Sequence, residues 1–600
     1  MKKRLALLLA LILVLSVLAS CSAPDAKGYR VQAFPVLWKE RDAGSFELRF
    51  YDAAPHVPYC GMKAYLDYMR GEEVTLTAGV GSVWEVTDPL GNMIEVDPAA
   101  GTITAADWAG FRDPMIRYKT PPHVFDTNIS WIGFTATVYE DEPAPVVFDF
   151  AKYGIPIYYE GKEIYMPLGL MTTMFNGGES RHMVFNGESI TLPWFDAENG
   201  TTLPLSFYDS RRMQDLLNGR TKREEDEIRE DYAELCFIID YFFGYPGASA
   251  LDPVIRERGL DETLKARAGD IRTALLSDDY IDFMIGLYKL TGMRLDDGHT
   301  GYIGIKGILD DEGAFPAVSL RFSQKAARMN PPKGEAIEEI HNSIRETRAA
   351  VWGDETYREC GSTAIIRLDS FLADKDAWND FYAGKGDLPG DALGVTVSGL
   401  KKASENPAVR NVLFDISANG GGDVVSMMAV LDLAAGINRF RGYDVLTRQR
   451  FYSDVRTDKD LDKALTDGDD EIRYGFNYAV LTSRASFSAA NMFPVMMQEH
   501  GAVLIGEPSG GGSCAVMFGV LSGGAEFLIS GNSLAFRTLD GGSVEDGCRT
   551  DIPIARIEPE KATHPNARLS DGDYSPFFDD EALDRMINEW FDAQEEAPAA

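Results

Sequence analysis

Cysteine and histidine are scarce in this chain. Its 600 residues include 6 Cys and 7 His. The cysteines are widely scattered and form no C-x-x-C pair, which argues against a structural zinc site and against a dense disulfide framework. A single disulfide, between Cys514 and Cys548, stays open. Because histidine is rare here, one that lies in a glycine-rich setting is a notable candidate for acid–base chemistry.

Basic residues are also few relative to acidic ones. Lys and Arg total 58 against 93 Asp and Glu, a formal net charge of −35. This balance argues against a nucleic-acid partner, since nothing would offset the repulsion by phosphates, and it suits a solvated extracytoplasmic surface. With 45% hydrophobic and 25% charged residues the composition is that of a globular protein, and the length predicts several domains.

Long apolar runs are confined to the N-terminus. Residues 1–4 are basic and residues 5–17 are apolar, a run too short for a confident membrane span. The following Leu-Ala-Ser-Cys at 18–21 resembles the lipobox of bacterial lipoproteins. We therefore expect a signal peptide at 1–20, lipidation of Cys21, a tether at 21–28, and a lipid-anchored protein on the outer face of the cell membrane. The alternative is an ordinary secretory signal in which Cys21 is incidental.

Periodicity divides the rest of the chain. Residues 29–215 are rich in aromatics, Gly, Pro and alternating runs, which favours β structure. Within them, 54–66 and 159–171 resemble weak internal copies. Residues 216–300 have helical spacing, notably at 224–243 and 260–276, and 301–358 form a connecting region with a helix at 332–350. Residues 561–600 contain a C-terminal helix and an acidic tail.

Residues 359–560 alternate between strand and helix patterns, which predicts an α/β domain with a largely parallel sheet. Strand-type runs are expected at 362–368, 409–416, 478–482, 502–505 and 525–529. Helical runs are expected at 391–402, 424–435 and 489–500.

The segment Thr482–Asn491 contains several serines between a buried-looking strand and an apolar helix. Small residues there would let the backbone approach a substrate, and a hydroxyl at the N-terminus of a helix is well placed for a nucleophile. Two interpretations compete on this segment alone. Either a serine at 486 or 488 is catalytic, or the serines only cap the helix.

Three further segments contain chemically suitable residues. His299, between Gly298 and Thr300, is a candidate general base, or else a surface or capping histidine. The glycines after Asn419 could turn amides inward as an oxyanion hole, or form only a tight turn. Glu545 could orient the histidine, or be an exposed turn carboxylate. No G-K-S/T sequence follows a glycine run, so a phosphate loop is not expected.

The order of these motifs resembles the C-terminal-processing (tail-specific) serine peptidases. The motifs are D-G-H-T at 297–300, D-x-x-x-N-G-G-G at 415–422, F-S-A-A-N at 487–491, G-E-P-S-G-G-G at 506–512 and V-E-D-G at 544–547. The resemblance implies a core related to the crotonase/ClpP fold and a peptide substrate. It assigns Ser488 as nucleophile, with Ala489 and a glycine of the pair Gly420 and Gly421 as oxyanion donors.

The resemblance also selects a branch of that family. Gly512 stands where the better-known branch has a catalytic lysine, so a Ser–Lys dyad is not expected. His299 and Glu545 match the branch that includes tricorn-like peptidases and uses His and Glu instead. No module of PDZ size is expected between 299 and 361, and no metal or organic cofactor is required.

These observations predict a lipid-anchored extracytoplasmic serine endopeptidase with a Ser488–His299–Glu545 triad. Two alternatives stay open. One is a catalytically inactive lipoprotein of the same fold that binds peptides or cell-wall fragments. The other is a structural surface lipoprotein in which the N-terminal β-rich region is the functional part.

Overall fold

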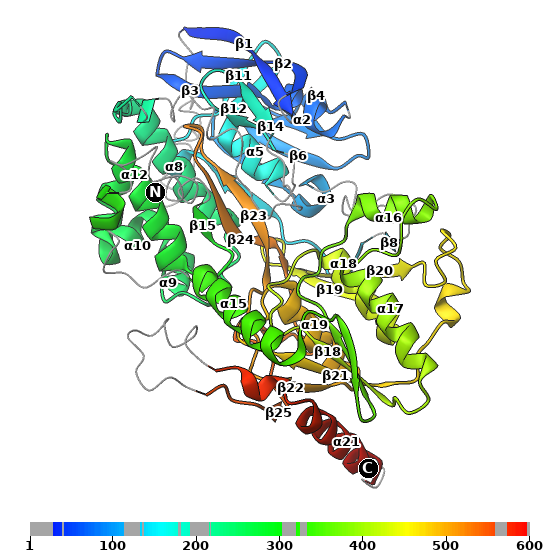
Figure 1. Cartoon of the computed structure of the whole chain (residues 1–600). Helices are drawn as coiled ribbons and strands as arrows, with labels where there is room; N and C mark the ends of the chain where they lie inside the picture. Colours follow the sequence, from blue (N-terminus) through cyan, green and yellow to red (C-terminus); the bar gives the residue numbers. More distant parts are fainter. Residues whose placement is uncertain are drawn as a thin grey trace, which may run out of the picture.

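The fold has a β-rich N-terminal part at one end, helices along one side and an α/β part at the other end (Figure 1). The computed structural model describes residues 28–38, 41–71, 73–112, 132–134, 137–177, 182–192, 215–216, 218–302, 320–324, 333–557 and 573–596. The predicted signal peptide, Cys21 and the tether up to residue 27 lie outside this set.

Two sheets form the β-rich part. The first has strand order β11-β12-β3-β2-β1-β14-β13, and the second, which is antiparallel throughout, has order β10-β7-β6-β5-β4. The strands of the first sheet are β1 (Tyr29–Trp38), β2 (Arg41–Tyr51), β3 (Ala54–Gly61), β11 (Tyr158–Glu160), β12 (Glu163–Pro167), β13 (Val184–Phe185) and β14 (Ile190–Leu192). Those of the second are β4 (Thr75–Ala78), β5 (Trp84–Thr87), β6 (Met93–Asp97), β7 (Thr102–Ala105) and β10 (Val146–Asp149).

The two segments that resemble internal copies form the same local unit. In each, a strand runs directly into a helix: β3 into α2 (Met62–Arg70), and β12 into α5 (Leu168–Asn176). Strands β3 and β12 are antiparallel neighbours, with Tyr165 opposite Gly61. Both helices pack their apolar residues into one core, which contains Leu66 and Leu170.

Helices of the middle region pack along the side of this core. They are α8 (Glu225–Phe242), α9 (Asp252–Arg258), α10 (Leu260–Arg267), α11 (Gly269–Leu275) and α12 (Tyr280–Tyr288), which continues as a π-helical turn, η2 (Lys289–Leu295). The single helix expected at 260–276 is wrong in one respect. Ala268 leaves the helical conformation, with φ −149° and ψ 51°, and the chain starts a new helix at Gly269.

The C-terminal part is built on a sheet with strand order β16-β17-β18-β21-β22-β25. All pairs in it are parallel except β16 with β17. The strands are β16 (Tyr357–Cys360), β17 (Thr363–Arg367), β18 (Asn411–Asp415), β21 (Asn477–Thr482), β22 (Val503–Gly506) and β25 (Ile552–Pro553). The predicted α/β class is thereby confirmed.

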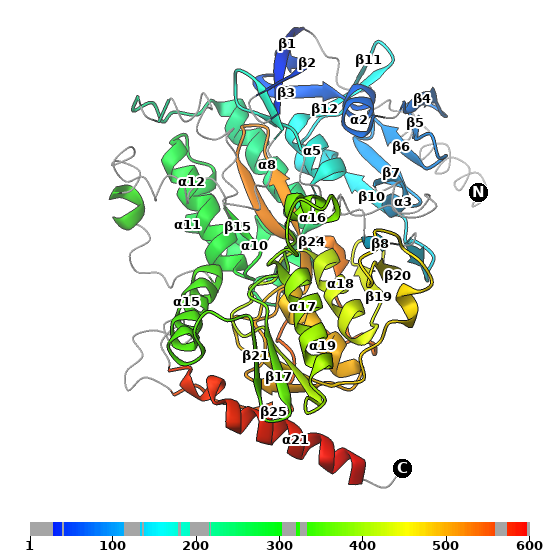
Figure 2. The same ribbon diagram turned by 45° about the vertical axis from the view of Figure 1, so that its right-hand side comes forward.

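Helices cover both faces of this sheet (Figures 1 and 2). Neighbouring residues on one strand enter opposite cores: Val412 and Phe414 face one, and Leu413 faces the other. A strand buried on both faces needs a continuous apolar run, which is why these strands are uniformly hydrophobic. The helices of the first core are α17 (Ala392–Glu405), α18 (Val424–Ala435) and α19 (Ala489–Glu499), and those of the second are α15 (Lys333–Trp352) and α21 (Asp580–Glu596).

An antiparallel sheet joins the N-terminal and C-terminal parts of the fold. Its order is β15-β24-β19-β20-β8, with β23 paired to β24 and β9 to β20. Its strands are β8 (Ile132–Phe134), β9 (Val138–Tyr139), β15 (Gly301–Tyr302), β19 (Arg439–Asp444), β20 (Gln449–Thr457), β23 (Cys514–Val520) and β24 (Glu526–Ala535). The strand expected at 525–529 is therefore the start of the longer strand β24, which forms a hairpin with β23. Strands β8 and β9, from the N-terminal region, extend this sheet of the C-terminal part.

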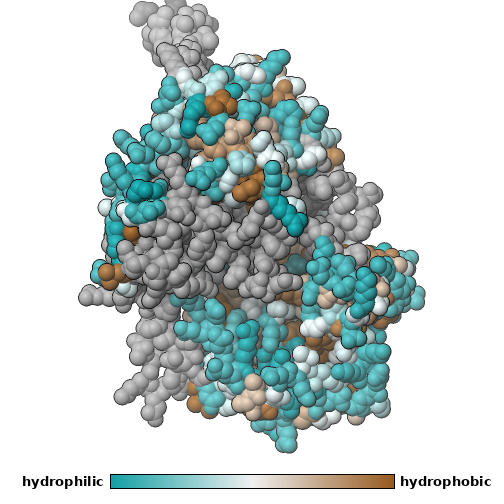
Figure 3. Space-filling view, turned by 45° about the horizontal axis from the view of Figure 1, so that its top comes forward, coloured by the Kyte–Doolittle hydropathy of each residue, from teal (hydrophilic) through white to brown (hydrophobic). Residues whose placement is uncertain are grey.

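The described surface is mostly hydrophilic on the face that Figure 3 shows. Large exposed apolar side chains such as Val80, Leu320 and Leu539 are scattered along the sequence. None of the described helices combines the length and apolarity that a membrane crossing requires. The five cysteines in the described residues are all free, so Cys514 and Cys548 form no disulfide here.

Candidate active site

Ser488 has an unusual backbone conformation at the start of α19. Its φ of 56° and ψ of −121° are rare for a non-glycine residue. Its amide donates to Gly511 O at 2.9 Å, and its carbonyl accepts bonds from Asn491 and Met492. The side chain is partly exposed and accepts no bond from the helix amides. Its hydroxyl is therefore not a helix cap, and such local strain is typical of functional turns.

Ser486 has a different role. Its hydroxyl is buried, donates to Ile416 O at 2.8 Å and accepts from Ser483 N at 3.1 Å. The Ser483 hydroxyl in turn donates to Ser417 O. These two serines join the turn before α19 to the loop after β18. Among the serines of this turn, Ser488 is the one whose hydroxyl makes no hydrogen bond to another described residue.

The glycine loop after Asn419 lies against the same turn. A Cβ atom at Gly421 would lie 2.8 Å from Ser488 Cβ and 3.0 Å from Ala489 N, so only glycine fits there. The Gly421 amide donates to Asn419 Oδ1 at 2.8 Å. By contrast, no hydrogen-bond partner within the described residues occupies the amides of Ala489 or Gly420. Two of the three predicted oxyanion donors are thus open in this structure.

His299 lies between η2 and β15, in a turn stabilised by Asp297. The Asp297 carboxylate accepts bonds from the amides of His299 and Thr300 and from the Thr300 hydroxyl. The imidazole ring packs on Phe487, with ring centroids 4.7 Å apart. Its Nδ1 is buried and has no hydrogen-bond partner among the described residues. Burial lowers the pKa of His299 to about 4, although the nearby Glu545 charge opposes this shift.

Glu545 is buried, with 8% of its surface exposed, which rules out the alternative of an exposed turn carboxylate. One carboxylate oxygen, Oε2, accepts bonds of 2.8 Å from both the amide and the hydroxyl of Ser513. The other, Oε1, has no hydrogen bond within the part of the chain described, and the Lys333 ammonium lies 3.8 Å from it. A Cβ atom at Gly511 would lie 3.3 Å from Glu545 Oε1 and one at Gly512 would lie 3.1 Å from His299 Cε1, so the two side chains lie against consecutive residues of one loop.

One loop, residues 511–513, contacts all three predicted catalytic residues. Gly511 O accepts the Ser488 amide, and Ser513 holds Glu545. A Cβ atom at Gly512 would lie 2.7 Å from Phe487 Cζ and 3.1 Å from His299 Cε1, and its φ is +84°. A lysine therefore does not fit at 512 unless His299 and Phe487 move. No direct hydrogen bond joins Ser488, His299 and Glu545 in the described structure.

Two residues at this site, Lys333 and Ser513, were not predicted from the sequence. Lys333 comes from the start of α15, in a stretch with no motif to mark it. Ser513 follows the glycine run directly, and its small hydroxyl side chain was the available signal.

Asn491 links the helix of Ser488 to the loop of Glu545. It is fully buried; its Nδ2 donates to Val544 O at 3.1 Å, and its Oδ1 accepts the Ser509 hydroxyl at 2.6 Å. The Ser509 hydroxyl also accepts the Cys548 amide. The amide of Asn491 is thus a structural tie across the site.

Asn491→Asp is expected to lower the free energy of unfolding by about 3 kcal/mol at pH 7, because a buried carboxylate would face the Val544 carbonyl without a donor. Urea unfolding measures this loss. The same change at the exposed Asn379 is the control and should be near neutral. Equal stabilities of the two variants would show that the bond to Val544 is not formed.

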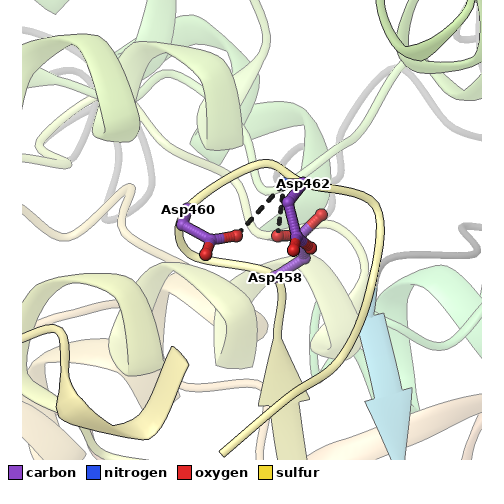
Figure 4. Close-up of side chains that lie close together, drawn as sticks. All are labelled: Asp458, Asp460 and Asp462. Atoms are coloured by element: carbon purple, nitrogen blue, oxygen red, sulfur yellow. Dashed lines mark hydrogen bonds between the residues drawn. The ribbon is translucent and has the colours of Figure 1, made fainter. Parts of the chain in front are cut away.

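Three aspartates gather in the loop after β20 (Figure 4). Carboxylate oxygens of Asp458, Asp460 and Asp462 all lie within 4.8 Å of one another. The Asp462 amide donates to both Asp458 and Asp460, and Asp458 also accepts the Tyr382 hydroxyl and the Lys463 amide. The carboxylates thus accept hydrogen bonds that hold a tight loop together, and we assign no metal to them.

Comparisons with known proteins place this site in a family context. The model of peptidase family S41 matches residues 362–554, which include Ser488, Glu545 and the glycine loop. No curated protein sequence matches the chain.

Solved structures resemble the chain at low identity. A protein from Parabacteroides merdae named as a candidate peptidase is 16% identical, with 55% of this chain and 90% of that chain covered and a TM-score of 0.36. A lipoprotein from Streptococcus agalactiae is 13% identical, with coverages of 55% and 92% and a TM-score of 0.30. The photosystem II D1 C-terminal processing protease is 17% identical, with coverages of 36% and 48% and a TM-score of 0.23.

The family model therefore carries the assignment. Its limits, 362 and 554, enclose the parallel sheet, the helix of Ser488 and the loop of Glu545, while His299 lies upstream of them. Residues 362–554 match the model of peptidase family S41, and this match indicates a serine-type peptidase.

Proposed function

We propose that this protein is an extracytoplasmic serine endopeptidase that cleaves peptide bonds through Ser488, His299 and Glu545. The observation that carries the proposal is the loop 511–513. It contacts Ser488 through Gly511, lies against His299 at Gly512 and holds Glu545 through Ser513. Three residues that are far apart in sequence thus share one small loop inside a peptidase domain.

The roles follow from the chemistry of the three side chains. His299 accepts the hydroxyl proton of Ser488, which attacks the peptide carbonyl carbon. The imidazolium that forms needs an acceptor for its Nδ1–H. Both His299 Nδ1 and Glu545 Oε1 are buried without hydrogen bonds in the described structure, so Glu545 Oε1 is a chemically suitable acceptor for that proton.

The open amides support the next step. Ala489 N and Gly420 N would donate to the oxyanion, and Gly421 N would join them if it released Asn419. His299 then returns its proton to the leaving amine, and an acyl-enzyme on Ser488 remains. Water, deprotonated by His299, hydrolyses that ester. The reaction uses no group beyond these residues and water.

The location belongs to the same proposal. The basic and apolar N-terminal residues and the small residues before Cys21 support export and lipid anchoring at the outer face of the cell membrane. The acidic net charge of −35 suits that environment, and the substrate would be a peptide or protein.

A fluorophosphonate probe tests the proposal, because it bonds covalently only to an activated serine. We expect labelling of the intact protein, with the mass increase on the peptide that contains Ser488. Labelling elsewhere, or none, would contradict it. An unlabelled protein whose melting temperature rises with added peptide would instead be the inactive, peptide-binding lipoprotein.

Hydrolysis by the free enzyme is expected to persist to about pH 5, unlike that of an enzyme with an ordinary histidine. Burial lowers the pKa of His299 to about 4, and the neutral imidazole is the form that accepts a proton. Hence kcat/KM should fall only as the pH drops through that value, a limb that steady-state assays from about pH 3.5 to 8 would resolve. Tryptophan fluorescence at each pH separates this limb from acid unfolding. A limb near 6.5 would mean that His299 is not the base.

A further inference from the structure

A lysine that no sequence motif marks lies beside the proposed catalytic groups. Lys333 is the first residue of α15, and its backbone amide donates to Asp296 Oδ1 at 2.6 Å, which ties the helix to the segment of His299. Its ammonium lies 3.8 Å from Glu545 Oε1 and 5.3 Å from the centre of the Phe487 ring. The side chain is 26% exposed, so it reaches the site from its edge.

Only one oxygen of Glu545 is open to a cation. Oε2 is occupied by the amide and hydroxyl of Ser513, which fixes the carboxylate in place. Oε1 has no hydrogen bond in the described structure. Two groups are candidates to pair with that oxygen. One is the Lys333 ammonium, which is close to it, and the other is the unpaired Nδ1 of His299. Because both groups are cationic when His299 is protonated, they repel each other, and each weakens the attraction of the other to the Glu545 carboxylate.

We propose that Lys333 is a positioning residue of the catalytic site that shares Glu545 with His299 and thereby sets the lower pH limit of hydrolysis. The inference rests on the proposed function and adds a fourth residue to it. With Lys333 present, the imidazolium is repelled and its counter-ion is divided, so His299 stays a free base in more acidic solution. The same repulsion makes the imidazolium of the transition state less stable. Lys333 therefore lowers the rate of hydrolysis near neutral pH and extends hydrolysis to lower pH.

The other charged groups around His299 do not take this role. On its own segment, Asp297 is committed to Thr300 and to the His299 amide, and Asp296 to the Lys333 amide. On β23, burial raises the pKa of Cys514 to about 12, which keeps its thiol neutral. On α9, burial raises the pKa of Asp252 to about 6, and the charges of Asp297 and Glu545 contribute to this rise. Burial lowers the pKa of His299 most and the Glu545 charge raises it; Lys333, the cation among these groups, lowers it by a smaller amount.

The test is the pH dependence of kcat/KM for Lys333→Met in the full chain. Removal of the ammonium should move the acidic limb upward by about half to one pH unit, so that kcat/KM at pH 4 falls about two- to five-fold while kcat/KM at pH 8 is unchanged or higher. Lys333→Arg keeps the charge and should leave the limb near that of the wild type. Lys152→Met is the matched control, because the Lys152 ammonium lies 3.7 Å from the largely buried carboxylate of Asp240 outside the site, and it should not move the limb.

A second measurement is independent of turnover. In the Ser488→Ala background, labelled histidine would give at most 7 imidazole NMR signals, and the His299 signal should titrate at a higher pH when Lys333 is replaced by Met. An active Lys333→Met enzyme with an unmoved limb, or an unmoved His299 titration, would overturn the proposal. Complete loss of activity in a folded Lys333→Met protein would also overturn it, since Lys333 would then be the base. Absence of Ser488-dependent hydrolysis in the wild type would overturn the proposed function itself.

Discussion

Replacement of Ser488 by alanine is expected to reduce peptide hydrolysis by about 10⁴-fold or more while the protein stays folded. The Ser488 hydroxyl makes no cap hydrogen bond to α19, so its removal leaves the helix start intact. The backbone bonds that hold the turn, from Ser488 N to Gly511 O and from Asn491 N to Ser488 O, do not involve the side chain. Peptide hydrolysis assays and fluorophosphonate labelling should both drop to background.

Ser486→Ala is the matched control for this experiment. The Ser486 hydroxyl bonds Ile416 O and Ser483 N, so its loss should lower the free energy of unfolding by about 1–3 kcal/mol. The folded fraction should nevertheless react with the probe at Ser488. The opposite pattern, in which Ser486→Ala is unlabelled and Ser488→Ala is active, would assign the nucleophile to Ser486.

Gly512→Ala is expected to lower kcat/KM by about 100-fold or more. The added methyl group would lie 2.7 Å from Phe487 Cζ and 3.1 Å from His299 Cε1, distances at which the rings must shift. A displacement of the base by about 1 Å is enough to cause a loss of this size. Steady-state kinetics with a peptide substrate measure it, and circular dichroism checks that the fold is retained.

Backbone strain alone could reduce stability at Gly512, since its φ is +84°. Gly541 has almost the same φ, +85°, but a Cβ atom there meets no atom within 4 Å. Gly541→Ala therefore introduces the same backbone strain but no new side-chain contact. It should lower the free energy of unfolding by about 1 kcal/mol and leave kcat/KM unchanged. If both variants lost activity to the same extent, displacement of His299 would not be the cause.

Local patterns predicted many elements well. The helix expected at 424–435 is α18 with those bounds, because Asp423 caps its first turn and Gly436 ends it in the left-handed conformation. The strand before Ser488 and the helix after it were also predicted closely, since both are continuous apolar runs beside a turn of small residues. These features depend on neighbours within one or two helical turns.

Pairings between distant segments were beyond local patterns. β8 and β9, from 132–134 and 138–139, pair with β20 more than 300 residues later. Nothing in such short strands specifies a partner, so the expected boundary between the β-rich region and the α/β domain missed them. The break at Ala268 was likewise hidden, because the apolar spacing continues across it.

For this protein, the sequence by itself determined the strand–turn–helix of Ser488, the alternation of the α/β domain and the order of the motifs, because these are encoded in contiguous residues. Only the tertiary structure decided which hydroxyl is free. Ser486 becomes a structural donor once the loop after β18 packs against it. It also decided that Lys333 lies beside one carboxylate oxygen of Glu545 and that His299 packs on Phe487, since their chain segments meet only when β15, α15 and the loop after β24 pack around Phe487 and Gly512.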